Sequence, residues 1–205
     1  MKKLLLILGI LFIGTSLLQA QSVQEILNKT SAKIKNAQGI TANFSYSVKD
    51  KNNVSQGSGS GNMTLKGNKY YIKQGSNEIF FDGKQVWNFN GSDEVHISAA
   101  RDNADVLTPE KIINADFKSG YTSKLVSGSG NTYNIELIPT DKRQNFTKIN
   151  LVISKATHLI SSASVVDKSG NTTKFTLSNI KTNVKVQDSK FLFDVRKYPG
   201  IEVIG

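Results

Sequence analysis

The segment from Gly57 to Ile97 constrains the fold more than any other part of the chain. It contains short runs rich in aromatic and β-branched residues, separated at even intervals by Gly, Asn and Asp. Runs of this kind between turn residues are typical of β-strands. Asp82-Gly83 and Asn90-Gly91 are dipeptides that two-residue hairpin turns prefer. The segment therefore predicts an antiparallel meander of short strands with many apolar side chains.

The first twenty residues are typical of an export signal. Lys2 and Lys3 precede an almost wholly apolar run, and Ala20 supplies the small residue of a cleavage site. The run is shorter than the roughly 20 apolar residues that a spanning helix needs. We therefore expect residues 1–20 to be a cleaved signal peptide and residues 21–205 to form one domain. The chain has no cysteine, and without a lipid-modified cysteine or a disulfide it fits a bacterial periplasm.

The chain is basic, but its basic residues are dispersed. The formal net charge of +10 falls to +8 when Lys2 and Lys3 leave with the signal. No run of five or six basic residues occurs, and export makes nucleic acid a poor candidate as a partner. Two interpretations of the charge stay open. It gives either a solvated basic surface or a surface that docks to anionic headgroups or to an acidic partner.

Two helices are expected outside the strands. Ser22–Glu25 has the pattern of a capping box and opens an apolar stripe with helical spacing. Thr108-Pro109 is typical of a second helix start. This second helix is short and lies between polar segments, which favours a lid, although an ordinary connecting helix fits nearly as well. The helix residues expected to act as lid or plug are Ile26, Leu27, Ile112, Ile113 and Phe117.

Strands dominate the rest, with ten or eleven expected. Asp50–Gly61 reads as a mobile polar hairpin connection, and a final strand is expected near Val184–Val186. Two short helices cannot cover the apolar face of so large a sheet. We therefore expect a mainly β fold, in which a strongly curved, incomplete antiparallel barrel encloses an apolar cavity. A packed two-layer sandwich is the alternative. Strand alternation predicts as the lipid-binding lining Phe44, Tyr46, Val48, Met63, Leu65, Trp87, Phe89, Val95 and Ile97.

Catalytic chemistry is not indicated. His96 and His158 each stand alone beside apolar residues in strand contexts. The chain lacks the common nucleophile, zinc-protease and phosphate-loop motifs, and no helix follows the Gly57–Gly61 run as a phosphate-binding loop requires. We therefore expect no enzyme activity, no catalytic residue, no metal and no cofactor.

Five short motifs, taken in order, resemble a known family. They are Phe44-Ser45-Tyr46, Gly61–Lys66, Phe81–Asn90, Asp167–Phe175, and the closing Phe191-Leu192-Phe193 with Pro199-Gly200. Their order resembles the periplasmic outer-membrane lipoprotein carrier proteins of the LolA type. In that family an Asp-Gly-Lys turn precedes a strand that carries Trp and a second aromatic residue, as Phe81–Asn90 does here.

The resemblance implies a monomeric carrier with helices plugging an incomplete barrel. It implies that acylated lipoproteins are received from an ATP-driven inner-membrane transporter and delivered to an outer-membrane receptor or to the membrane itself. The family commonly has Arg-Pro after the second strand, where this chain has Gly67-Asn68. Whether Lys66 or Lys69 replaces that lid-latching arginine stays open. Two alternatives also stay open: a lipid- or lipoprotein-sensing module of the same architecture, and a packed two-layer β structural or interaction protein.

Overall fold

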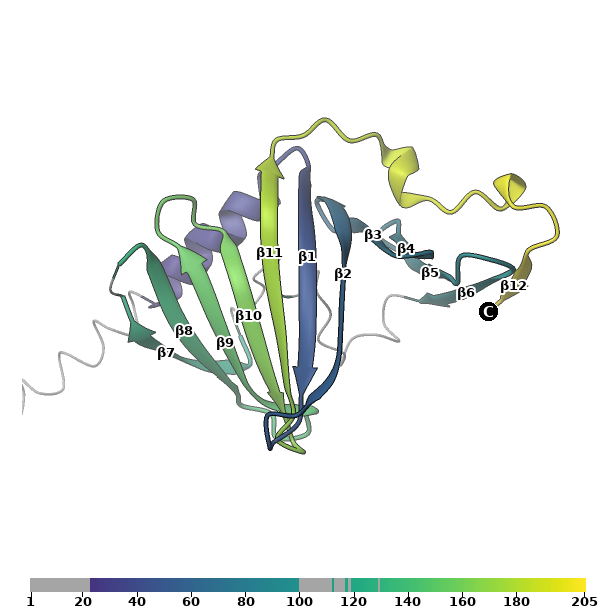
Figure 1. The fold of residues 1–205 in the computed structure, drawn as a ribbon. Helices are drawn as coiled ribbons and strands as arrows, with labels where there is room; N and C mark the ends of the chain where they lie inside the picture. The colour runs from purple at the N-terminus through teal and green to yellow at the C-terminus, as the bar shows by residue number, and fades with distance from the viewer. Residues whose placement is uncertain (1–22, 100–111, 113–116, 118, 129) are drawn as a thin grey trace, which may run out of the picture.

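The computed structural model describes residues 23–99, 112, 117, 119–128 and 130–205. Within this range, twelve strands form one curved, open sheet (Figure 1). They are β1 Ile40–Lys49, β2 Ser55–Lys66, β3 Lys69–Gln74, β4 Asn77–Phe81, β5 Gln85–Phe89, β6 Glu94–Ala99, β7 Tyr121–Ser127, β8 Thr132–Pro139, β9 Phe146–Ser154, β10 Ile160–Asp167, β11 Thr172–Thr182 and β12 Glu202–Ile204. The predicted mainly β, curved sheet with an N-terminal helix is confirmed.

The strand order joins two meanders at the middle of the sheet. The order is β12-β6-β5-β4-β3-β2-β1-β11-β10-β9-β8-β7. Neighbours are antiparallel except β12, which runs parallel to β6. The long strands β1 and β11 pair with each other, so the later meander is added beside the start of the first. This pairing makes one continuous surface from the two halves of the sequence.

The predicted hairpin connection at Asp50–Gly61 is wrong over its second half, because β2 already begins at Ser55. Two of its glycines make room for rings of β1. A Cβ atom on Gly61 would come within 2.7 Å of the Phe44 ring, and one on Gly59 within 2.7 Å of the Tyr46 ring. The glycine spacing of two residues is therefore a strand period with rings packed over it, and not a sign of a mobile loop.

The end of the chain also differs from the prediction. No strand forms at Val184–Val186, although the Val184 amide donates to the Gly39 carbonyl at 3.0 Å. The chain continues through two short 3-10 helices, η2 Asp188–Phe191 and η3 Val195–Lys197, to the edge strand β12. We call residues 183–204 the C-terminal segment. Figure 1 shows it passing from the top of β11 across to β3–β6 and ending beside β6.

The sheet has two distinct faces. We call the face that the N-terminal helix covers the inner face, and the opposite one the outer face. The helix occupies residues 23–35, and its buried positions recur every three to four residues along one side. Its buried side chains are Val23, Ile26, Leu27, Thr30, Ser31 and Ile34. The apolar members of this stripe pack into the same cluster as side chains of β1, β2, β3, β8, β9 and β10.

Candidate functional site: the apolar inner face

The inner face carries one continuous apolar cluster. Across the middle of the sheet, Ala42 of β1 pairs with Met63 of β2, which pairs with Ile72 of β3. All three are nearly inaccessible to solvent. On the other half, Ile149, Leu151 and Ile153 are fully buried; the same cluster also contains Ile40, Phe44, Leu65, Ile135, Leu137, Phe146, Leu159, Ile160 and Ala163. Such a surface has no strong polar anchor and recognises a ligand by apolar contact.

The inner face continues beyond the part that is fully buried. Half-buried side chains that pack against the cluster include Tyr46, Tyr70, Ile79, Val165, Phe175 and Leu177. The Tyr46 and Phe175 rings lie 6.1 Å apart between centroids, and the Gln74 side-chain amide donates to the Tyr46 hydroxyl at 3.0 Å. These residues form an incompletely covered apolar rim, which we call the inner rim.

A small hollow opens on the β3–β6 end of the sheet. Its volume is about 260 Å³, and Ile72, Ile79, Asn88 and His96 line it together with neighbouring residues. Ligand sites commonly measure about 300–1,000 Å³. This hollow is smaller than such a site, and most of the inner face that the structure describes is buried by its own side chains.

The side chains predicted as lid or plug do lie in the inner cluster wherever the structure describes them. Ile26 and Leu27 reach it from the N-terminal helix, and Ile112 and Phe117 are also buried there. The Phe117 ring meets the Tyr121 ring edge-on at 5.5 Å. Ile113 and the predicted helix start at residues 108–109 lie outside the described residues. The described residues cover the apolar face, and whether they open for a ligand stays a prediction.

The nine predicted lining residues do not share one face. Phe44, Tyr46, Val48, Met63 and Leu65 belong to the inner face, as predicted. The other four, Trp87, Phe89, Val95 and Ile97, belong to the outer face. The register shows this directly, because Trp87 pairs with Phe80, which pairs with Tyr71, and Tyr71 pairs with Thr64. Thr64 lies between the inner residues Met63 and Leu65 and therefore points outward. Tyr71, Phe80 and Trp87, which are paired across the strands with Thr64, point outward with it.

The reason for this error is that β3, β4 and β5 carry apolar residues on both faces. Tyr70 and Ile72 of β3 face inward while Tyr71 faces outward, and β4 repeats the pattern. Alternation alone cannot choose a face for such strands. The outer cluster that results contains Tyr71, Phe80, Phe89 and Val95 together with Phe191 and Phe193 of the C-terminal segment. In the sequence, the alternation of Phe191, Leu192 and Phe193 was the feature that could have indicated a contact between the C-terminal segment and the outer face.

Phe193 is the centre of the outer cluster. Its ring centroid lies 4.9 Å from that of Tyr198, 5.4 Å from Phe89, 5.5 Å from Phe80 and 5.7 Å from Trp87. Trp87 and Tyr198 both stack on Phe193, with interplanar angles of 21° and 10°. Aromatic pairs at these separations add to the stabilisation from buried area. The C-terminal segment is therefore held on the outer face chiefly by this ring cluster.

Charged groups fix the same segment beside the rings. The Lys190 ammonium lies 3.6 Å from the centroid of Tyr71, and burial lowers the pKa of Lys190. The Tyr71 hydroxyl donates to Glu78 at 2.7 Å, and Lys73 pairs with the other oxygen of Glu78 at 2.7 Å. Burial, followed by the contact with Glu78, raises the pKa of Tyr71. Tyr71 thus stays neutral and donates at ordinary pH.

Lys66 and Lys69 both bind Asp188 of the C-terminal segment. Each ammonium lies 2.7 Å from one Asp188 oxygen, and Lys66 also donates to the Val186 carbonyl at 2.9 Å. The two lysines lower the pKa of Asp188 to about 2. These contacts are on the outer face, away from Ile112 and Phe117. The lysines that flank the family's arginine position therefore fasten the C-terminal segment in this structure.

Metal-binding side chains do not cluster in the part of the chain that the structure describes. No group of three or more His, Asp or Glu side chains that could hold a metal ion occurs there. His96 belongs to β6, whereas His158 belongs to the connection between β9 and β10, so the fold does not bring the two histidines together. Within the described range, no helix is long and apolar enough to cross a membrane.

The fold and the site together define a class: open, curved half-barrels with a large apolar face that a helix covers. The chain belongs to the outer membrane lipoprotein carrier protein LolA family, whose model matches residues 35–194. This family consists of binding and transport proteins rather than enzymes. Membership supports a lipoprotein-carrier role and lipoprotein cargo.

Related proteins match over nearly their full length. The outer-membrane lipoprotein carrier protein of Legionella pneumophila (strain Corby) is 29% identical over 222 aligned residues, covering 100% of this chain and 99% of the relative. That of Pseudomonas putida (strain GB-1) is 26% identical, covering 98% and 97%. Among solved structures, an uncharacterised conserved protein from Thermus thermophilus superposes with a TM-score of 0.59 at 14% identity, covering 89% of this chain and 98% of that one. This similarity concerns the fold alone.

Proposed function

We propose that the protein is a periplasmic carrier that holds the acyl chains of lipoproteins against its inner face and moves them from an inner-membrane transporter to the outer membrane. The observation that carries the proposal is the continuous apolar cluster on that face, which ends in the half-buried inner rim. The family and the relatives named above support lipoprotein as the cargo. The rim offers acyl chains an apolar point of entry on the incompletely covered part of the inner face.

The energetics favour a carrier that releases its cargo. Burying an acyl chain of about sixteen carbons gains on the order of 10 kcal/mol relative to water, at about 0.8 kcal/mol per methylene. Uncovering the inner face requires Ile26, Leu27, Ile112 and Phe117 to leave it, and exposing each such side chain costs about 1.5–3 kcal/mol. The two terms are of similar size for one chain. Loading therefore needs more than one acyl chain, or work supplied from outside, and the closed empty form favours release.

We further propose that this work comes from an ATP-driven inner-membrane transporter. The bilayer offers an acyl chain the same apolar gain as the inner face, so transfer from the membrane to the protein is close to neutral at best. Delivery to an outer-membrane receptor, or to the membrane itself, then proceeds downhill, since refilling of the inner face by the protein's own side chains compensates for the lost contacts.

The test is loading with a purified triacylated lipoprotein, measured by native mass spectrometry of the complex. Phe175→Asp places a carboxylate in the inner rim beside Tyr46, and we expect it to lower the loaded fraction at least tenfold, since a charge in an apolar site is strongly disfavoured. Thr176→Asp is the matched control, because Thr176 is the next residue of β11 and is exposed on the outer face. Circular dichroism checks that both variants keep the fold.

The outcomes separate the alternatives. Loss of loading in Phe175→Asp with normal loading in Thr176→Asp supports the carrier. Equal loading in the wild-type protein and both variants contradicts the use of the inner face. A wild-type protein that takes up neither the lipoprotein nor a hydrophobic fluorescent probe contradicts the carrier function and favours a packed structural protein with the same fold.

A further inference from the structure

The C-terminal segment exposes apolar side chains. Seven large apolar side chains are exposed within the described residues, and four of them lie in this segment. They are Leu192, Val195, Val203 and Ile204, with exposed fractions of 52%, 38%, 45% and 37%. Large exposed side chains that gather in one place commonly mark an interaction surface.

The exposure follows from how the segment is fastened. Phe191 and Phe193 both point into the outer cluster, with exposed fractions of 0% and 8%. Leu192 lies between them in extended backbone, so its side chain points to solvent. Val195 begins η3, a turn without any buried residue. The ring contacts that hold the segment in place therefore present Leu192 and Val195 outward.

The C-terminal segment is rich in basic side chains, and two of its three carboxylates are paired with cations. Lys185, Lys190, Arg196 and Lys197 lie in the segment. Asp188 is bound by Lys66 and Lys69, and Asp194 is bound by Arg196 at 2.8 Å and 3.1 Å. Glu202 adds one exposed carboxylate on β12. The C-terminal segment, taken with Lys66 and Lys69, is thus basic overall.

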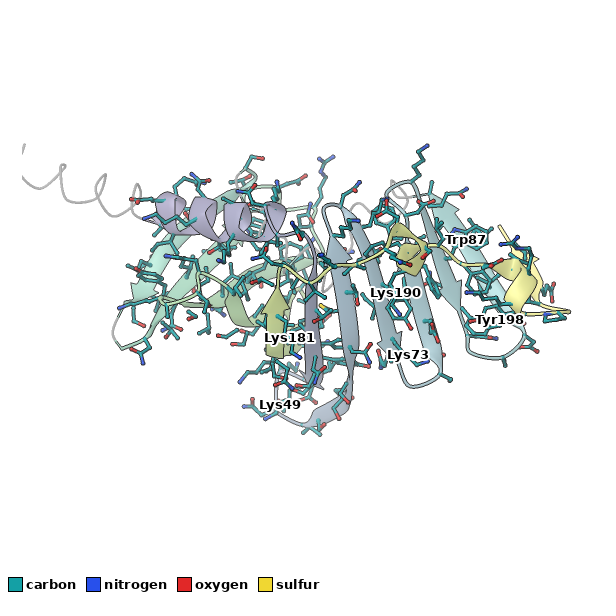
Figure 2. All side chains as sticks on the ribbon, turned by 90° about the horizontal axis from the view of Figure 1, so that it is seen from above. Lys49, Lys73, Trp87, Lys181, Lys190 and Tyr198 are labelled. Atoms are coloured by element: carbon teal, nitrogen blue, oxygen red, sulfur yellow. The ribbon has the colours of Figure 1, made fainter. Side chains whose placement is uncertain are left out.

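Two aromatic residues flank the same surface. Trp87 and Tyr198 are half-buried, and each stacks on one flank of Phe193. Figure 2 shows Trp87, Tyr198 and Lys190 on the one face over which the C-terminal segment runs, with Lys73, Lys181 and Lys49 extending along it. Trp and Tyr with one apolar and one wet side are favoured at the boundary between lipid and water.

We propose that the C-terminal segment docks the outer face onto an anionic bilayer surface. Leu192 and Val195 enter the acyl boundary, Trp87 and Tyr198 lie at the headgroup level, and the lysines contact phosphate groups. Protruding apolar side chains in a basic segment fit a bilayer better than a folded partner, which would need a shaped contact surface. Docking concerns the outer face and does not depend on acyl binding at the inner face.

The chain contains a built-in reporter for the test. Trp87 is its single tryptophan. The purified, cargo-free protein is mixed with vesicles of one part phosphatidylglycerol to two parts phosphatidylethanolamine, and in parallel with phosphatidylcholine vesicles. We expect binding to the anionic vesicles that weakens with salt, a blue shift of Trp87 emission, and quenching by brominated lipid. Because Trp87 faces outward, lipid taken up at the inner face leaves its emission unchanged.

Two pairs of variants test the surface itself. Leu192→Asp with Val195→Asp should reduce vesicle binding more than tenfold, since carboxylates oppose both insertion and anionic lipid. Val126→Asp with Ile138→Asp is the matched control, because these side chains are 58% and 46% exposed on β7 and β8. The double variant Lys185→Gln/Lys197→Gln should weaken vesicle binding about fivefold per lysine. The control double variant Lys33→Gln/Lys142→Gln, elsewhere on the surface, should leave vesicle binding unchanged.

Vesicle binding lost only in the C-terminal variants supports the proposal. Absence of vesicle binding by the wild-type protein overturns it, as does an equal loss in the control variants. Binding to a soluble acidic protein with no binding to anionic vesicles also overturns it. Lipoprotein loading measured on the same variants keeps the two proposals apart, because we expect the C-terminal substitutions to leave loading in detergent-free solution unchanged.

Discussion

Replacing Phe193 by alanine should release the C-terminal segment while leaving the rest of the sheet folded. Phe193 contacts rings of β4 and β5 and Tyr198 of its own segment, and it has no contact with the inner cluster. The N-terminal helix and the later strands are packed into the inner cluster instead. The consequence of losing the ring is therefore local.

The expected magnitude follows from the contacts of that ring. Phe→Ala at a buried site costs about 3–5 kcal/mol. Two of the four partner rings, Trp87 and Tyr198, are only half-buried, which favours the lower part of this range. A loss of about 3 kcal/mol in local stability corresponds to opening about 150 times more often. The contacts left to hold the segment are those of Phe191, Asp188 and Lys190 and the pairing of β12 with β6. Of these, burial of Phe191 supplies about 1.5–3 kcal/mol.

The assay is hydrogen exchange by mass spectrometry, together with Trp87 emission. Peptides from residues 188–204 of Phe193→Ala should exchange about 150-fold faster, and Trp87 emission should shift to the red, while β8–β10 peptides keep their protection. Phe146→Ala is the matched control, since Phe146 is 6% exposed in the inner cluster. It should lower the melting temperature of the whole protein by about 10 °C. Equal global destabilisation by both variants would refute the independence of the two clusters.

Two further predictions concern the fastening of the outer segment and the glycines of β2. The pKa of Asp188 is lowered to about 2. Its contacts with Lys66 and Lys69 are therefore complete above about pH 4 and are lost as the pH falls toward about 2. Trp87 emission should change in that pH interval, and the change should disappear in Asp188→Asn. Gly61→Ala should cost about 1–3 kcal/mol in denaturant unfolding, because its Cβ would clash with the Phe44 ring and the Lys73 carbonyl. Exposed Ser60→Ala should cost little, and an unchanged midpoint for Gly61→Ala would contradict the close packing.

Much of the fold can be predicted from local sequence patterns, because each of these patterns is compatible with only one kind of local structure. The Asp82-Gly83 turn does separate β4 from β5, and the helical stripe beginning at Val23 is buried on one side throughout. The order of the family motifs correctly indicates a curved open sheet. These features depend on neighbours in the sequence, so tertiary contacts have little opportunity to override them.

The face of each strand in β3–β6 could not be predicted in the same way. When a strand has apolar residues on one side only, the sequence shows which side is buried, as for Ala42 and Phe44 in β1. Tyr70, Tyr71 and Ile72 are apolar in succession, and either parity buries a large side chain. The outer side chains of these strands are covered by the C-terminal segment, and Phe193 is more than a hundred residues from Tyr71 along the chain. The same contact turns the paired lysines after β2 toward Asp188, which no local pattern indicates.

The two-sided apolar pattern of β3–β6 bears on both proposals. If all nine predicted lining residues faced one cavity, the outer side of these strands would need no cover, and Phe191 and Phe193 would have no site to fill. Because Trp87 and Phe89 face outward, the protein has two apolar surfaces separated by one sheet, each with its own cover. A helix shields the inner one, and the C-terminal segment both shields the outer one and exposes Leu192. The two proposals, cargo binding and contact with a bilayer, therefore concern opposite faces of the sheet.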